Sequence, residues 1–105
     1  MINNVFGLLG ISMKAGKLTF GTDSTMDMLS KRKIKLIIVA KDSSERTIRH
    51  FKEKCKEYNI SFYIFGSKGE ISKAIGKDNK TVIGIKDKHL AEAIKKILDG
   101  GDVIG

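Results

Sequence analysis

Short apolar runs alternate with helical patterns along this chain, and this alternation restricts its possible folds more than any other feature. Residues 36–40 and 81–85 are rich in Ile and Val and have polar neighbours on both sides, which is typical of buried strands. Residues 18–20 and 60–65 are also predicted to be extended. Since helical patterns flank every run, we predict an α/β fold, a three-layer α/β/α sandwich with a four-stranded mixed sheet.

The spacing of the apolar residues predicts five helices, over residues 4–14, 21–30, 42–58, 67–75 and 90–98. Two of them begin at sequences that resemble capping boxes, residues 42–45 and 67–70, in which a polar cap is followed three positions later by Glu. Gly76 is placed to end the fourth helix. The predicted elements therefore have well-marked boundaries.

The chain contains no proline, linker, internal repeat or low-complexity segment at which it could divide into domains. Its 105 residues, 41% of them hydrophobic, suffice for one core but not for two. We therefore predict a single domain over residues 1–99. The glycine-rich residues 100–105 have few anchoring side chains, and we expect them to form a flexible tail.

Positive charge dominates the composition, with 20 Lys and Arg against 12 Asp and Glu and a net charge of +8. In a small domain this excess favours a polyanionic partner, and nucleic acid is the first candidate. A membrane surface is disfavoured because no single amphipathic basic helix is present, while a role in solubility alone remains an alternative. Residues 31–35 are either a phosphate-binding patch or a solvated turn.

Catalytic and metal-binding patterns are missing from the sequence. The segment 10–17 differs from a phosphate-binding Walker loop in both its glycine spacing and the residue after Lys17. Cys55, His50 and His89 have no ligand spacing for zinc, and Cys55 is expected to be a buried apolar residue. We predict neither enzymatic activity nor a cofactor, metal site or small-molecule substrate. No membrane-spanning run or signal peptide is evident, which predicts a cytoplasmic protein.

Residues 14–29 form the segment with the most distinctive chemistry. They indicate a helix end, a short strand and a new helix that opens with Gly21, Thr22, Asp23 and Ser24. The first backbone N–H groups of a helix lack intrahelical partners and can bind anions or base edges. An ordinary capped helix is the alternative interpretation of these residues.

Several motifs, in this order, resemble the ribosomal protein L-seven-Ae and L-thirty-e superfamily. They are Lys14-Ala-Gly-Lys17, Gly21-Thr-Asp-Ser24, the segments 36–42 and 55–59, and the segment 67–76. The Ala-Gly-Lys motif points to the bacterial YlxQ-type branch. The resemblance covers residues 4–98 and implies the same sandwich fold, no catalysis, and binding of structured RNA, classically a kink-turn with sheared G·A pairs.

The resemblance also implies a binding surface made of the helix opening and of the loop that follows the short fourth helix. Gly21 to Ser24 would face base edges, while nearby basic side chains would meet phosphates and extend the positive surface. The predicted RNA-binding residues are Lys17, Gly21, Thr22, Asp23, Ser24, Lys41, Arg46, Gly76, Lys77, Asp78, Asn79 and Lys80. We expect a monomer whose partner is ribosomal or kink-turn RNA, or the ribosome itself.

The helix opening departs from the family pattern at Asp23, Ser24 and Asp27, where Asn, Glu and Lys are usual. An ionised Asp23 can accept hydrogen bonds from guanine N–H groups but cannot donate one, and Asp27 would repel an RNA backbone. The alternative function is therefore a ribosome- or translation-associated protein-interaction module that has lost specific kink-turn recognition.

Overall fold

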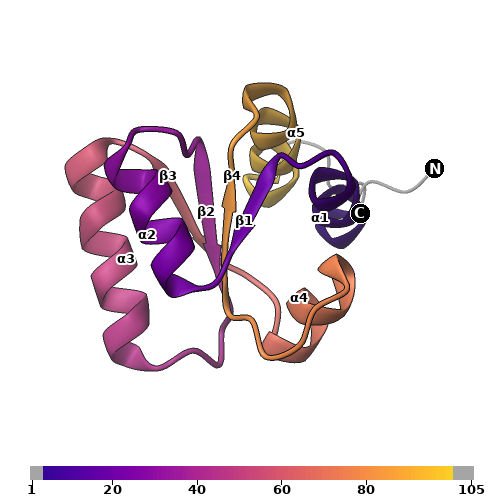
Figure 1. Cartoon of the computed structure of the whole chain (residues 1–105), viewed down its shortest axis with the longest axis horizontal. Coiled ribbons are helices and arrows are strands. Elements are labelled where there is room, and N and C mark those ends of the chain that lie inside the picture. The colour runs from indigo at the N-terminus through magenta and orange to yellow at the C-terminus, as the bar shows by residue number, and fades with distance from the viewer. Residues whose placement is uncertain (1–3, 101–105) are drawn as a thin grey trace.

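The computed structural model describes residues 4–100, which form five helices around one four-stranded sheet (Figure 1). In chain order the elements are α1 (Val5–Lys14), β1 (Leu18–Phe20), α2 (Thr22–Ser30), β2 (Leu36–Val39), α3 (Glu45–Tyr58), β3 (Ser61–Ile64), α4 (Lys68–Ile75), β4 (Val82–Ile85) and α5 (Lys88–Leu98). The predicted α/β/α sandwich is confirmed. The predicted tail, residues 100–105, lies outside the described residues except for Gly100.

The sheet has the strand order β1-β4-β2-β3, so β4 lies between two strands that precede it in the chain. β4 runs antiparallel to both β1 and β2, whereas β2 and β3 are parallel, and the sheet is therefore mixed. The central strands β2 and β4 are buried along their whole length. Their continuous apolar sequences follow from this, because helices cover both faces.

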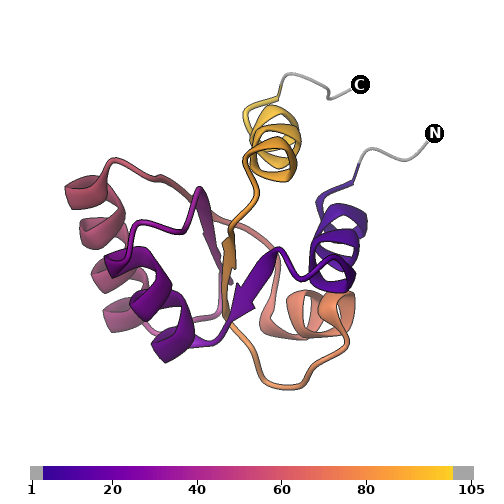
Figure 2. The ribbon, with the colours of Figure 1, turned by 45° about the horizontal axis from the view of Figure 1, so that its top comes forward.

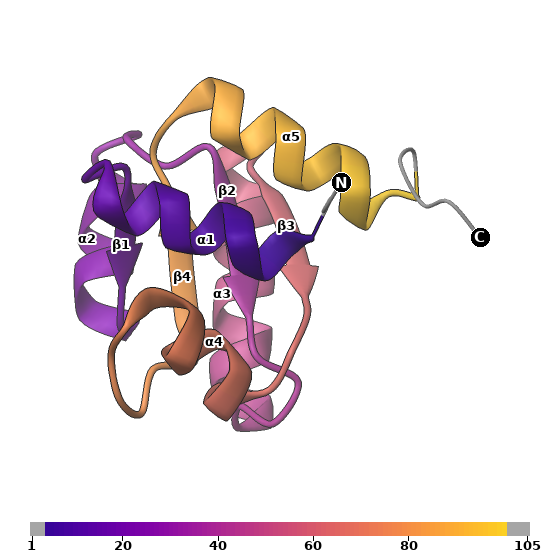
Figure 3. The same ribbon diagram turned by 90° about the vertical axis from the view of Figure 1, so that its right-hand side faces the viewer.

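Helices α2 and α3 cover one face of the sheet, and α1, α4 and α5 cover the other (Figures 2 and 3). The single core expected from the composition is divided by the sheet into two: in β2, Leu36 and Ile38 pack beneath α1, α4 and α5, while Ile37 and Val39 pack beneath α2 and α3. Cys55 lies in the second core, as predicted, and burial raises the pKa of its thiol to about 12. It is therefore a structural residue.

Of the two capping boxes predicted from the sequence, one is present and the other is not. Ser67 and Glu70 form the predicted capping box of α4. The predicted box at residues 42–45 is wrong, because α3 begins two residues later than Asp42 implied and its cap is Ser44, which accepts the N–H of Thr47. The Asp42 carboxylate instead accepts the N–H of Lys68 in α4 at 2.8 Å. Asp42 thus connects the β2–α3 loop to the first residue of α4 rather than capping its own helix.

The strand directions give the molecule two chemically distinct ends. Strands β1, β2 and β3 all finish at the same end, which we call the carboxyl end, and β4 starts there. Helices α2, α3 and α4 begin at the carboxyl end. Helices α1, α2 and α3 end at the opposite end, the amino end, where α5 begins. No helix within residues 4–100 is long and apolar enough to cross a membrane.

Candidate nucleic-acid interface

The start of α2 differs from that of every other helix in residues 4–100, because no side chain caps it. Its N-cap is Gly21, at φ +92°, whereas the other four helices begin at Asn4, Ser44, Ser67 and Asp87, whose side chains each accept a backbone N–H. No side chain thus occupies the first N–H groups of α2. Together with the helix dipole, they can interact with an electronegative ligand atom.

The second predicted element, the loop between α4 and β4, has a defined conformation. Gly76 and Asn79 both adopt the left-handed region, at φ +71° and +58°. The buried Ser72 hydroxyl accepts the N–H of Lys80 at 2.8 Å and donates to the carbonyl of the same residue at 3.1 Å. The Lys77 N–H is also bonded, to the Ser72 carbonyl at 2.9 Å. Both lysines of the loop, Lys77 and Lys80, are therefore held in place by hydrogen bonds of their backbones.

The helix start and the loop meet at the carboxyl end (Figure 1), and Phe20, directly before Gly21, contacts the two lysines of the loop. The Gly21 N–H donates to the Val82 carbonyl at 2.9 Å, which joins the first residue of β4 to the cap of α2. The ammonium groups of Lys77 and Lys80 lie 5.2 and 5.4 Å from the centroid of the Phe20 ring. These cation–π contacts hold two positive charges beside the start of α2.

Arg46 lines a pocket between α2 and α3, beside Thr22 at the start of α2. The pocket has a volume of about 280 Å³ and is lined by Thr22, Arg46, Thr47, His50 and Phe51. The other predicted basic residue, Lys41, follows β2 directly and donates its backbone N–H to Gly66 at 2.7 Å. Both residues are exposed at the carboxyl end, as the predicted surface requires.

Two further polar residues of α2 lie beside β1, an edge strand of the sheet. Ser24 and Asp27 line a second pocket, of about 300 Å³, together with β1 and Met28. The Asp27 carboxylate pairs with the Lys31 ammonium at 3.1 Å, so a neighbouring cation offsets the negative charge of Asp27. Both side chains are about half exposed, and solvent weakens the pair. Asp23 is exposed in the first turn of the helix.

Lys17 does not join the other predicted residues. It precedes β1, and its carbonyl accepts the N–H of Lys86, which follows β4, at 2.8 Å. This hydrogen bond lies at the amino end, whereas Gly21 lies at the carboxyl end of the same strand. Proximity in sequence to the helix opening therefore does not bring the Lys17 backbone to the predicted surface.

Two contributions to this surface escaped the sequence analysis. The first is Ser72, whose hydroxyl fixes Lys80 across a sequence separation of eight residues. His50 and Thr47 line the pocket beside Thr22 because α3 packs next to α2. A Ser buried on an otherwise apolar helix face was the available signal for the first. No local pattern indicated the second.

Opposite charges are equally frequent at the carboxyl end. The segments 21–25, 40–47, 65–70 and 76–81 contain the cations Lys41, Arg46, Lys68, Lys77 and Lys80 and the carboxylates Asp23, Asp42, Glu45, Glu70 and Asp78. The formal net charge of this end is therefore zero. The excess of positive charge in the chain lies elsewhere.

Comparison with known proteins identifies the family. The chain is 37% identical over 93 residues to the RNA-binding protein YlxQ of Enterococcus faecium, with 89% of each chain covered. It is 27% identical over 94 residues to that of Bacillus subtilis, with 90% of this chain and 94% of the relative covered. A solved structure of a Bacillus halodurans protein of unknown function matches with a TM-score of 0.89 and 26% identity, covering 93% of this chain and 99% of the other. Because the model of the ribosomal protein L7Ae/L30e/S12e/Gadd45 family matches residues 3–95, the chain belongs to that family.

Proposed function

We propose that this protein binds structured RNA of the kink-turn type through its carboxyl end. The observation that carries the proposal is the junction at Phe20, where the uncapped start of α2 meets the α4–β4 loop and its two lysines. Two relatives are named RNA-binding proteins, which supports RNA as the ligand. RNA recognition commonly uses splayed bases in loops and bulges, and the pockets on either side of α2 offer space for them.

The proposed contacts divide into two kinds. Thr22, Asp23, Ser24 and the free N–H groups of α2 face base edges and provide specificity. Lys41, Arg46, Lys77 and Lys80 contact phosphates and position the RNA, each adding to the salt dependence of binding. Because an ionised Asp23 only accepts hydrogen bonds, its partners would be guanine N–H groups. The pairing of Asp27 with Lys31 reduces the repulsion of a nearby phosphate.

The test uses a fluorescein-labelled kink-turn RNA and the same RNA with its G·A pairs replaced by Watson–Crick pairs. Anisotropy titrations at two salt concentrations should give the kink-turn RNA at least about tenfold tighter binding, equivalent to about 1.4 kcal/mol. Lys77→Gln should weaken the binding of the kink-turn RNA and reduce its salt slope by about one. Equal affinity for the two RNAs, unaffected by Lys77→Gln, would exclude the proposed site.

Lys52→Gln is the matched control, because Lys52 is an exposed residue in the middle of α3 and its loss changes the net charge equally. We expect the control to leave the preference for the kink-turn RNA unchanged. Asp23→Asn, which restores an amide that can donate and accept, should increase this preference because it removes a negative charge from the base-facing helix turn.

A second function is favoured by the balance of charges at the carboxyl end. Five carboxylates among five cations suit a protein partner at least as well as a phosphate backbone, which agrees with a ribosome- or translation-associated interaction module. Ribosome cosedimentation that persists when excess RNA competes would favour this module. Loss of cosedimentation under the same competition would favour RNA binding. In either case we propose a cytoplasmic monomer.

A further inference from the structure

The positive charge of this protein is concentrated at the amino end. The four segments that meet there, residues 14–17, 30–35, 56–60 and 86–89, contain nine Lys and Arg and only two carboxylates, Glu57 and Asp87. Their formal net charge is +7, out of +8 for the whole chain. A polyanion approaching this protein would therefore meet its strongest attraction at the amino end.

Backbone hydrogen bonds join three of these segments into one surface. The Lys86 N–H donates to the Lys17 carbonyl at 2.8 Å, and the Lys35 N–H donates to the Ile85 carbonyl at 2.7 Å. The starts of β1 and β2 are thus fixed on either side of the end of β4. Lys17 and Lys35 are exposed and Lys86 is partly exposed, so residues far apart in the sequence present their charges on one side.

Stabilisation of helix ends accounts for only part of this charge. Cations near a helix C-terminus interact favourably with the helix dipole, which explains Lys14, Lys31 and Lys56. Lys35 and Lys86 lie outside the helices, and Lys88 lies in the first turn of α5, where the dipole disfavours a cation. In residues 4–100, neither Lys35 nor Lys88 forms an ion pair. The helix dipoles therefore do not explain these three cations.

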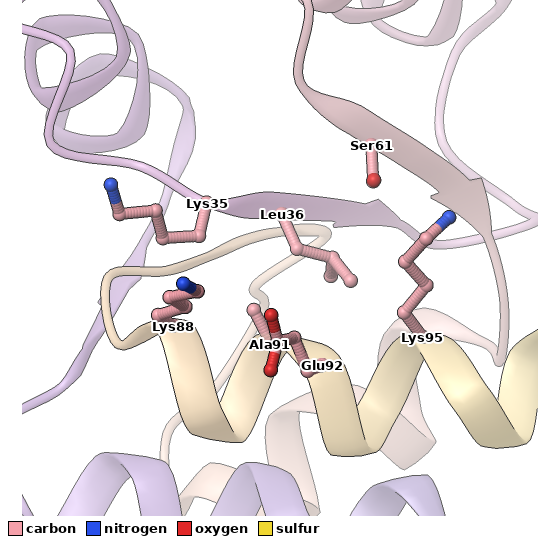
Figure 4. Close-up of a pocket in the computed structure, with 7 residues that line it drawn as sticks. All are labelled: Lys35, Leu36, Ser61, Lys88, Ala91, Glu92 and Lys95. Carbon is pink, nitrogen blue, oxygen red and sulfur yellow. The ribbon is translucent and has the colours of Figure 1, made fainter.

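A pocket beside this surface could receive a phosphate group. It has a volume of about 440 Å³ and lies between α5 and the starts of β2 and β3. Figure 4 shows Lys35 and Lys88 across from each other at one end of the pocket, with Lys95 at the other. Lys95 is already engaged, because its ammonium contacts Asp99 and Tyr63. Glu92 also lines the pocket and offsets one of the two remaining lysine charges, so Lys35 and Lys88 leave a net positive charge there.

We infer that the amino end is a second RNA-binding surface, which contacts the phosphate backbone of an RNA segment other than the one at the carboxyl end. The inference rests on the proposed function for the identity of the polyanion. Because the two ends face opposite directions, a straight RNA helix lying on one cannot reach the other. The protein would thus bridge two RNA segments, the first recognised by its bases and the second by charge alone.

Two triple variants with the same net charge separate the surfaces. K33Q/K35Q/K88Q removes three exposed cations from the amino end. It should retain the preference for the kink-turn RNA, but its affinity for a plain RNA duplex should fall at least about tenfold, with a salt slope lower by about two to three. The other variant, K41Q/K77Q/K80Q, should lose tight kink-turn binding and keep most of its affinity for the duplex.

Bridging is measured directly by mixing a donor-labelled kink-turn RNA with an acceptor-labelled duplex. The wild-type protein should produce energy transfer between the two RNAs, and K33Q/K35Q/K88Q should abolish it. R49Q/K52Q/K73Q is the control, because it loses three exposed cations outside both ends and should retain the transfer. Circular dichroism melting of each variant verifies that it remains folded.

The outcomes distinguish the two proposals. If K33Q/K35Q/K88Q gives energy transfer and binds the duplex as well as the wild type does, the second surface is overturned. If the variant loses duplex binding but the wild-type protein shows no preference for the kink-turn RNA, the second surface is supported and the proposed function is overturned. If the amino-end variant loses binding only to anionic phosphatidylglycerol vesicles, the surface serves a membrane and the inference is wrong. Absence of binding to either RNA would overturn both proposals.

Discussion

Ser72 fixes the α4–β4 loop through both backbone polar groups of Lys80, at 2.8 and 3.1 Å. Ser72 is only 6% exposed to solvent, so water does not readily replace its hydroxyl in these hydrogen bonds. A hydrogen bond of this kind contributes about 1 kcal/mol, and an unsatisfied group costs as much or more. One residue in the core layer thus determines where the lysines at Phe20 are held.

Ser72→Ala should release this loop and leave the rest of the fold intact. We expect faster hydrogen exchange at the Lys80 amide, measured by NMR, and a several-fold loss of affinity for the kink-turn RNA, because the loop lysines are no longer preorganised. Ser30→Ala is the control, since the exposed Ser30 hydroxyl donates to the Asp27 carbonyl at the far end of α2, away from the loop. Unchanged exchange at Lys80 in Ser72→Ala would refute the role of the hydroxyl.

At the scale of elements, the position of α2 depends on how closely it approaches β4. A Cβ on Gly84 would lie 2.6 Å from Oγ1 of Thr19, 2.8 Å from Cδ1 of Ile34 and 3.0 Å from Cγ2 of Thr25. Thr19 and Thr25 also share a buried hydrogen bond of 2.9 Å, which connects β1 to the helix. The absence of a side chain at Gly84 therefore allows α2 to pack on the sheet.

Gly84→Ala should separate α2 from the sheet and destabilise the protein by about 1–3 kcal/mol, the usual cost of overpacking a core. For a domain of this size, thermal unfolding should show a midpoint lower by roughly 5–20 °C. Gly69→Ala is the matched control: the first contact of its added Cβ is at 3.9 Å, and Ala favours a helix. Equal midpoints for the two variants would contradict this account of the packing.

At the scale of the whole molecule, charge is distributed unevenly between the two ends of the sheet. The carboxyl end has equal numbers of cations and carboxylates, whereas the amino end has nine cations and two carboxylates. Such an arrangement produces a field that orients the protein before contact with a polyanion. The net charge of +8 alone does not describe this field.

Chromatography on heparin should reveal the uneven distribution. K33Q/K35Q/K88Q and K41Q/K77Q/K80Q have the same net charge, and a uniform distribution would make them elute together. We expect the amino-end variant to elute at the lower salt concentration, because it loses charges that act together on the polyanion. Elution of both at the same salt concentration would contradict a localised positive surface.

The fold was largely predictable because its elements have strong local patterns. Residues 36–40 were predicted as a buried strand, and β2 spans Leu36–Val39 with every residue buried. The capping box at Ser67 was also predictable, since it depends on residues three positions apart. At Asp42 the same local rule failed, because a contact with the distant Lys68 amide competes for its carboxylate.

The candidate site was predictable only in part. Gly21 to Ser24 were predictable from the unpartnered N–H groups of a helix start, whereas Gly76 to Lys80 entered the predicted surface through resemblance to a family. In the structure Lys77 and Lys80 contact Phe20, which directly precedes Gly21. Neither the position of Lys17 nor the hydrogen bonds between Ser72 and Lys80 were evident from the sequence, because each depends on a partner outside its own element.

The sequence by itself determined the elements, their order, the composition of the cores and the excess of positive charge. Each of these depends on the identity and spacing of residues close together in the chain. Only the tertiary structure decided which charged residues lie at the same end of the sheet. β4 inserts between β1 and β2 and pairs Leu18 with Ile85, and this places Lys17 beside Lys86 at one end and Gly21 beside Val82 at the other. Strand order is set by burial and pairing between distant residues, which no local pattern encodes.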